Sequence, residues 1–243
     1  MQAESEHDIT IRWVPDFPGD FGVAAGEATL EAVLACGPAS VVGFSVGGLE
    51  VDREPFSGIV TRARAEGLRS LPHAGETGGP DRVWSAIRAL GADRIGHGVG
   101  SMSDLALVDY LREHQLPVDV SPTSNLCTRS VPGLEEHPLP RMLELGLLVT
   151  LNSDDPPMFG TDLTGEYRTA GRMGARPSRP GGPGPQRCAR QLPGAESEGQ
   201  VGRRHRQHPG TARSDFGARR QAVTVQLLCP PQWTSARPPA TRR

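Results

Sequence analysis

A chain of 243 residues is long enough to form one large domain with a substantial core. Its formal net charge of −2 hides an uneven distribution, because residues 175–243 hold 13 of the 26 basic residues, all of them Arg, and only three of the 28 acidic ones. The four Cys form no CxxC pair and no apolar run is long enough to cross a bilayer, which argues against a disulfide scaffold, a Cys-based zinc site and a membrane protein. Because the first residues are polar and acidic rather than leader-like, we expect a cytoplasmic protein.

Apolar stretches typical of strands alternate with helical patterns along residues 8–155. The expected strands cover residues 8–17, 40–46, 68–72, 93–97 and 116–120, and a last one begins at residue 147. The expected helices cover residues 28–35, 55–67, 80–90, 103–114, capped by Ser103, and 137–145. Strands joined by single helices predict a parallel sheet with right-handed crossovers. Six such units could form an open doubly wound sheet or most of an eight-unit barrel, and the lack of a GxGxxG or Walker A motif weakens the nucleotide-binding alternative.

Polar residues follow directly after four successive expected strands. They are His73 with Glu76, then His97, then residues 121–125, and finally Asp154 with Asp155. In a (β/α) barrel the loops after the strands share one face, so residues distant in sequence converge on one pocket. This distribution favours an α/β fold of the TIM-barrel type over the open sheet.

These polar residues suit metal-assisted chemistry. His73 offers an imidazole nitrogen and Asp154 an oxygen, a set that fits zinc or a similar divalent metal. A partly buried Glu76 could keep a proton near neutral pH and act as a general acid, and glycines beside His97 let the backbone approach a ligand. Taken one at a time, each residue has a structural alternative: the histidines could simply satisfy hydrogen bonds, and the two aspartates could cap the turn before Pro156. Four polar sites after four strands favour the functional interpretation.

Four motifs occur in the order and spacing of the adenosine/adenine deaminase family: HAGE at 73–76, RIGHG at 94–98, SPTSN at 121–125 and NSDDP at 152–156. The resemblance covers about residues 8–172. It implies a zinc-dependent (β/α)8 barrel that hydrolyses the 6-amino group of a purine to an oxo group and releases ammonia. The implied partner is therefore a small-molecule purine, with adenosine-type nucleosides expected first. Aminodeoxyfutalosine deaminases of menaquinone synthesis and adenine deaminases are the alternatives, since residues 121–161 also resemble theirs.

The resemblance implies a role for six residues of this chain. His73 and Asp154 resemble zinc ligands. Glu76 resembles the acid that protonates the purine ring nitrogen next to the attacked carbon, and His97 the group that orients and deprotonates the zinc-bound water. Asp155 resembles a contact to the imidazole-side ring nitrogen, and Gly48 a glycine whose backbone N–H meets the ring.

The sequence departs from the family at its start. The family's first strand carries a His-x-His pair that supplies two more zinc ligands, and residues 1–60 contain no such pair. The strand pattern begins with what resembles the third family strand. We therefore expect an N-terminally truncated chain whose residues 1–173 form about six of the eight βα units, with open sheet edges. Two remaining ligands should hold zinc weakly, so the chain is expected to show weak or no activity, and a non-catalytic remnant is the alternative.

The tail, residues 174–243, is rich in Arg, Pro and Gly and is predicted to be a region of low order. Alternation of apolar residues returns only at 222–228. Binding of nucleic acid by this basic tail is not favoured, because only Phe216 and Trp233 offer aromatic rings among its Arg residues. One codon choice for residues 188–193, read one nucleotide later, gives the Arg-x-Ser-Phe-Leu run of the family's final helices, so our hypothesis is a frame-shifted C-terminus.

Overall fold

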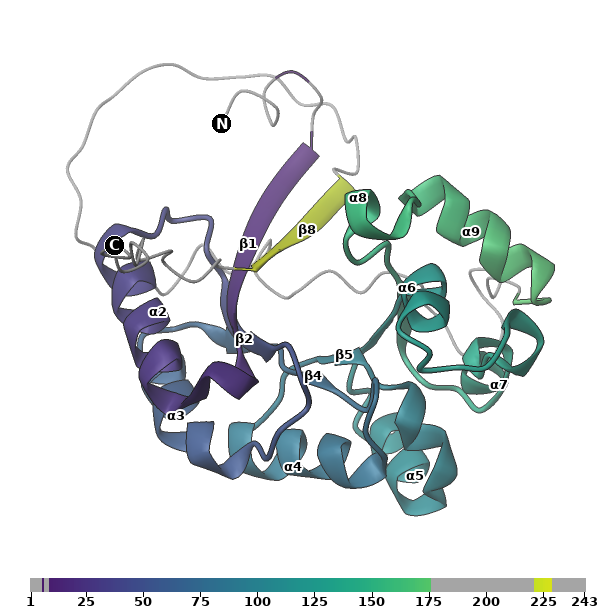
Figure 1. The fold of residues 1–243 in the computed structure, drawn as a ribbon, viewed down its shortest axis with the longest axis horizontal. Helices are drawn as coiled ribbons and strands as arrows, with labels where there is room; N and C mark the ends of the chain where they lie inside the picture. The colour runs from purple at the N-terminus through teal and green to yellow at the C-terminus, as the bar shows by residue number, and fades with distance from the viewer. Residues whose placement is uncertain (1–5, 7–8, 176–220, 229–243) are drawn as a thin grey trace, which may run out of the picture.

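The computed structural model describes residue 6, residues 9–175 and residues 221–228 (Figure 1). Within them the paired strands are all parallel, and they form two four-stranded sheets with the orders β3-β2-β1-β8 and β4-β5-β6-β7. The strands are β1 (Ile9–Pro18), β2 (Gly43–Gly47), β3 (Arg69–Ser70), β4 (His73–Ala74), β5 (Ile95–His97), β6 (Val118–Val120), β7 (Val149–Leu151) and β8 (Gln221–Leu228).

The two sheets meet in one stretch of chain, residues 69–74. The sequence predicts one strand here, at 68–72, that runs into the HAGE motif. Pro72 interrupts it, since proline has no backbone N–H for the sheet ladder. Hydrogen bonding continues across the break, because Asp93 N donates to Ser70 O at 2.8 Å and Gly96 N donates to Pro72 O at 2.9 Å. The strands therefore form one curved parallel array with six positions from β1 to β7, in which β3 and β4 share a position.

Helices cover the outer side of this array (Figure 1). Helix α2 packs against β1, α3 against β3 and α4 against β4. The helices are α2 (Gly22–Cys36), α3 (Ser57–Ala65), α4 (Pro80–Leu90), α5 (Leu105–Glu113), α6 (Pro122–Cys127), α7 (Leu139–Glu144), α8 (Pro156–Phe159) and α9 (Leu163–Arg172). Four 3-10 turns accompany them: η1 (Gly19–Phe21), η2 (Glu54–Phe56), η3 (Val99–Ser103) and η4 (Leu134–Glu136).

Two clusters of buried apolar side chains stabilise the array. One lies between β4–β7 and helices α4, α5 and α7, and it includes the fully buried Ile95, Leu107 and Val118. The other is aromatic: the ring of Phe17 lies 5.6 Å from that of Phe44 and 5.4 Å from that of Phe56. Burying each of these large side chains contributes about 1.5–3 kcal/mol, so the packing of helices on the sheet stabilises the fold.

Local signals explain where the helices begin and end. Pro80 stands in the first turn of α4, and Gly91, with a φ of 55°, ends that helix in the left-handed conformation that glycine adopts without strain. For α5 the predicted cap, Ser103, is wrong. Asp104 is the cap, because its carboxylate accepts from Ala106 N at 2.9 Å and Leu107 N at 3.2 Å, whereas the Ser103 hydroxyl donates back to Gly100 O.

Three features of the fold go beyond the sequence-based expectation. The SPTSN motif forms helix α6 rather than only a loop, and α8 and α9 follow the last strand. The alternating stretch at 222–228 lies in β8, which pairs with β1 from Ile9↔Gln221 to Asp16↔Leu228. The rest of the basic tail, including the proposed frame-shifted segment, lies outside the described residues. Among the residues that the structure describes, no helix is long and apolar enough to cross a membrane.

Candidate active site

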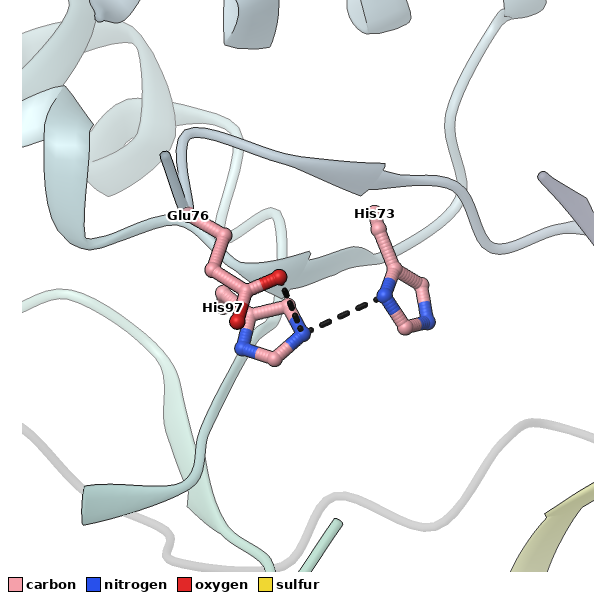
Figure 2. Close-up of side chains that lie close together, drawn as sticks. All are labelled: His73, Glu76 and His97. Atoms are coloured by element: carbon pink, nitrogen blue, oxygen red, sulfur yellow. Dashed lines mark hydrogen bonds and ion pairs between the residues drawn. The ribbon is translucent and has the colours of Figure 1, made fainter. Parts of the chain in front are cut away.

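Three predicted site residues meet at the carboxyl ends of β4 and β5 (Figure 2). His97 Nε2 lies 3.2 Å from His73 Nδ1 and 3.4 Å from Glu76 Oε2. One possible ligand atom from each of the three residues lies within 4.8 Å of the others. We call His73, Glu76 and His97 the histidine–glutamate cluster.

The backbone at this edge of the sheet is strained at two predicted site residues. His97 has a φ of 64° and Asp154 a φ of 56°, in the left-handed region that residues other than glycine rarely adopt. Such a conformation costs of the order of 1–3 kcal/mol and persists only where the surrounding structure holds it. Gly98, with a φ of 60°, continues the left-handed turn, and the His97 ring lies beside Glu76 (Figure 2).

Burial sets the charge of the cluster. It lowers the pKa of His73 to about 4, helped by the neighbouring His97, and it also lowers the pKa of His97. Burial raises the pKa of Glu76, against the opposing influence of His73 and a hydrogen bond with Thr128. At neutral pH the two imidazoles are therefore neutral, the form in which a histidine donates a lone pair to a metal.

The other three predicted site residues lie outside the cluster. Asp154 is exposed and accepts a hydrogen bond of 2.6 Å from Ser124 Oγ, and it does not belong to the group of ligand atoms within 4.8 Å found among the described residues. Asp155 caps helix α8 by accepting from Met158 N at 3.0 Å, as the structural alternative for this residue predicts. Gly48 is exposed with a φ of 68°, and an added Cβ would lie 2.8 Å from Asp20 Oδ1, so the position requires glycine.

Sequence reasoning missed Asp16, a fully buried carboxylate near the end of β1. Its Oδ2 lies 3.8 Å from His73 Nε2, on the far side of the His73 ring from the cluster. Metal-binding histidines commonly direct their second ring nitrogen at a carboxylate, which fixes the ring orientation. The signal available in the sequence was a single acid within an otherwise apolar strand, Trp-Val-Pro-Asp-Phe.

Sequence reasoning also missed Glu50, which holds the HAGE loop in place. Its carboxylate accepts four backbone hydrogen bonds of 2.5–3.2 Å, from the amides of Gly75, Glu76, Thr77 and Gly78. These amides all belong to the turn that carries the Glu76 side chain. Without an acceptor they would be left to water, so Glu50 fixes the loop from a position 25 to 28 residues earlier in the chain.

Arg53 also holds this region in place, through a hydrogen bond to the backbone of His73. It is fully buried, its pKa is lowered by that burial, and its Nη2 donates to the carbonyl of His73 at 2.6 Å. This hydrogen bond joins the backbone of His73, the first residue of β4, to the segment after β2. The segment that contains Glu50 and Arg53 therefore positions both ends of the turn from His73 to Glu76.

The donor set fits a zinc ion. Imidazole nitrogens and carboxylate oxygens are atoms that zinc prefers as ligands. Of the two predicted zinc ligands, the neutral His73 lies in the cluster, within 4.8 Å of a carboxylate oxygen of Glu76. A hollow of about 690 Å³ opens beside Glu76 and is lined by residues that follow β4, β5 and β6. This volume falls within the range of small-molecule pockets.

A parallel α/β array with histidine and carboxylate side chains at the carboxyl ends of its strands defines a partial barrel of the amidohydrolase class. The comparisons agree: an adenine deaminase from Arthrobacter aurescens has a TM-score of 0.67 at 32% identity, over 71% of this chain and 53% of that one. An amidohydrolase from Burkholderia ambifaria, solved with bound zinc, has a TM-score of 0.64 at 27% identity, over 70% and 48%. The predicted fold is confirmed.

Residues 2–175 match the family model for adenosine deaminase, and the chain belongs to that family. An aminodeoxyfutalosine deaminase of Streptomyces avermitilis is 47% identical over 175 residues, which are 70% of this chain and 49% of the relative. An adenosine deaminase of Edwardsiella ictaluri is 43% identical over 170 residues, 69% of this chain and 51% of the relative. The chain thus spans about half the length of the curated relatives it matches, and the family predicted from the four motifs is confirmed.

Proposed function

We propose that this chain carries part of a zinc-dependent aminohydrolase that converts the 6-amino group of an adenine compound into an oxo group. Water adds to the carbon that bears the amino group, the carbon–nitrogen bond breaks, and ammonia leaves with the proton that water supplied. The grouping of His73, Glu76 and His97 at one edge of the sheet, in a member of the adenosine deaminase family, is the observation that carries this proposal. The proposed catalytic part is residues 1–173, and residues 174–243 are given no role in it.

The proposed roles follow from the chemistry of each group. His73 and Asp154 hold the zinc, which when bound supplies a nucleophilic hydroxide near neutral pH. Glu76, whose pKa is raised by burial, gives a proton to the ring nitrogen next to the attacked carbon. His97 faces the attacking water. Asp154 already lies near enough to His73 for its charge to oppose the lowering of the His73 pKa by burial, which supports a metal shared by the two residues.

Two further residues are proposed to contact the purine. Asp155 would accept a hydrogen bond from the imidazole side of the purine, and Gly48 would offer its backbone N–H to the ring. One carboxylate oxygen of Asp155 accepts a hydrogen bond from the Met158 amide, and we propose that the second oxygen contacts the substrate. Gly48 is exposed and has no side chain, so a ring can approach its backbone closely.

Adenosine-type nucleosides are the first proposed substrates, with aminodeoxyfutalosine and adenine as the alternatives that bear the same amino-purine group. Because residues 1–60 contain no His-x-His pair to supply two further zinc ligands, we propose that the chain binds zinc weakly and is weakly active or inactive alone.

The test is to measure zinc content and ammonia release of the purified chain on adenosine, adenine and aminodeoxyfutalosine, with His73→Ala as the control. Substoichiometric zinc and slow release, both abolished in H73A, are the expected results. Stoichiometric zinc with rapid turnover would contradict the proposed weak activity. A folded chain that binds no zinc would contradict the proposed function and favour a non-catalytic remnant.

A further inference from the structure

A row of buried hydrogen bonds runs from the start of helix α7 to the histidine–glutamate cluster. The backbone N of Leu139 lies 3.1 Å from His137 Nδ1, and His137 Nε2 lies 3.3 Å from Asn125 Oδ1. Asn125 Nδ2 in turn lies 3.3 Å from Nδ1 of His97. Asn125 is fully buried, and His97 and His137 are each 4% exposed, so solvent offers these groups no alternative partners.

The direction of every bond in this row follows from its first member. A backbone N–H can only donate, so His137 Nδ1 must be the unprotonated, accepting nitrogen. The single proton of this imidazole then lies on Nε2 and is donated to the Asn125 carbonyl oxygen. That fixes the orientation of the amide, because the reverse orientation would set the amide NH₂ against the Nε2–H of His137. The NH₂ therefore donates to His97 Nδ1.

We infer that Asn125 and His137 are positioning residues that hold the proton of His97 on Nε2, facing Glu76 and His73. Both groups in front of that nitrogen can accept a hydrogen bond: Glu76 Oε2 at 3.4 Å and His73 Nδ1 at 3.2 Å. The tautomer of His73 is consistent with this arrangement. Its Nε2 lies 3.8 Å from the Asp16 carboxylate, which can accept the His73 proton, so its Nδ1 is the nitrogen that accepts.

The position of this proton decides what His97 can do. A nitrogen that carries a proton cannot ligate a metal, so His97 is excluded from the ligand set of the cluster in this tautomer. It also cannot take a proton from the attacking water through Nε2. Within the proposed function, on which this step rests, His97 donates a hydrogen bond to the attacking oxygen and stabilises the negative charge that develops there. This revises the general-base role that the family resemblance implies.

The fold holds the row rigidly. Asn125 lies in α6, where its N–H donates to Ser121 O at 2.9 Å and its carbonyl accepts from Val131 N at 3.2 Å. Leu139 is 2% exposed and is the first residue of α7. Neither end of the row can shift without disturbing a helix.

Long-range ¹H–¹⁵N correlation spectra of the metal-free ¹⁵N-labelled chain test the inference, because protonated and unprotonated ring nitrogens differ strongly in ¹⁵N shift. We expect His97 and His137 to show protonated Nε2. His114 is the internal control: its Nδ1 lies 2.9 Å from the Tyr110 carbonyl, which can only accept, so His114 should show protonated Nδ1. Finding His97 protonated on Nδ1 would overturn the inference, and this readout needs neither zinc nor turnover.

The near-isosteric variant Asn125→Asp sharpens the test by replacing the donor that faces His97 with an acceptor. In N125D the proton of His97 should move to Nδ1, while the signals of His137 and His114 stay unchanged. An unchanged His97 signal would overturn the role of Asn125. His137→Phe frees the amide to turn and should give His97 signals averaged between the two tautomers; a His97 signal that remains fully Nε2-protonated would overturn the role of His137. These outcomes are separate from failure of the proposed function, which rests on zinc content and ammonia release.

Discussion

The predicted site residues divide into an inner group, which the fold holds in place, and an outer group at exposed turns. The inner group, the histidine–glutamate cluster, lies at the ends of β4 and β5. Glu50 accepts from the Glu76 amide, Arg53 donates to the His73 carbonyl, and Asn125 contacts the His97 ring. The outer group of Gly48, Asp154 and Asp155 follows β2 and β7. A motif thus identifies a residue's chemistry, whereas its position depends on partners supplied by other parts of the chain.

The largest expected effect concerns zinc. His73→Ala should abolish zinc binding, because it removes the inner imidazole ligand, whereas Asp155→Asn should leave zinc affinity within about threefold, since Asp155 is a proposed substrate contact. Isothermal titration with zinc measures both. Equal zinc affinities for H73A and the unmodified chain would show that zinc binds away from His73. The division into an inner, metal-binding group and an outer group would then be wrong.

The next effect is a loss of stability in acid. Burial lowers the pKa of His137 to about 4 from an ordinary value of 6.5. Between these values the unfolded chain binds more protons than the folded one, so the stabilisation is complete above pH 6.5 and is lost as the pH falls towards 4. The change amounts to about 3 kcal/mol for this group.

Urea titrations at a series of pH values measure it. His137→Gln should flatten the dependence by that amount, whereas the exposed control His114→Gln should leave it unchanged. Identical pH profiles for H137Q and the unmodified chain would contradict a buried, neutral His137.

Removal of the Glu50 carboxylate, which accepts hydrogen bonds from the HAGE loop, should cause a smaller loss of stability. Glu50→Ala takes away a carboxylate that accepts four amide hydrogen bonds and should cost about 2 kcal/mol, since hydrogen bonds to charged groups contribute about 1.5–3 kcal/mol. Hydrogen exchange at residues 75–78 should accelerate in the same variant. The control is Asp52→Ala, an exposed acid two residues away. Unchanged exchange at these amides in E50A would show that the loop is fixed by other contacts.

The smallest expected effects are losses of stability when the capping aspartate of a helix is removed, and two helices can be compared. Asp104→Ala should be the more destabilising, because its carboxylate accepts two amide hydrogen bonds at the start of the nine-residue helix α5 and a third from Trp84 Nε1. Asp155→Ala should cost less, since it accepts one at the start of the four-residue helix α8. Thermal unfolding of the two variants gives the ranking, with Ser103→Ala as the neutral control. The reverse order would mean that the turn at Asp155 is held more firmly than its exposure indicates.

The sequence was most informative where residue type and strand ends coincide. His73, Glu76 and His97 could be identified because each lies at or shortly after the end of a predicted strand, and the strand order then brings them together. Asp16 and Glu50 could not, because their roles depend on contacts with residues at least 25 positions away, which no local pattern encodes. Ser103 and Asp104 are adjacent residues that can both cap a helix, and only the geometry of the chain entering α5 distinguishes them.

The pairing of β8 shows the same limit. Alternation at 222–228 indicates a strand, but the sequence carries no signal for its partner β1, which lies more than 200 residues earlier in the chain. Helix α6 was hidden for a different reason: Pro, Thr, Ser and Asn in its first turn are also typical of loops. Pro122 at the first position starts a helix here because the preceding strand ends at Val120.

Anomalous diffraction at the zinc edge, on crystals of the unmodified chain soaked with zinc, tests the central claim most directly. We expect one strong peak beside the imidazole of His73, about 2.0–2.1 Å from its nitrogen, with the Asp154 carboxylate as a second ligand. His97 should remain outside ligand distance. A peak remote from His73, or no peak at all in a folded chain, would contradict the assignment of this edge of the sheet as a metal centre.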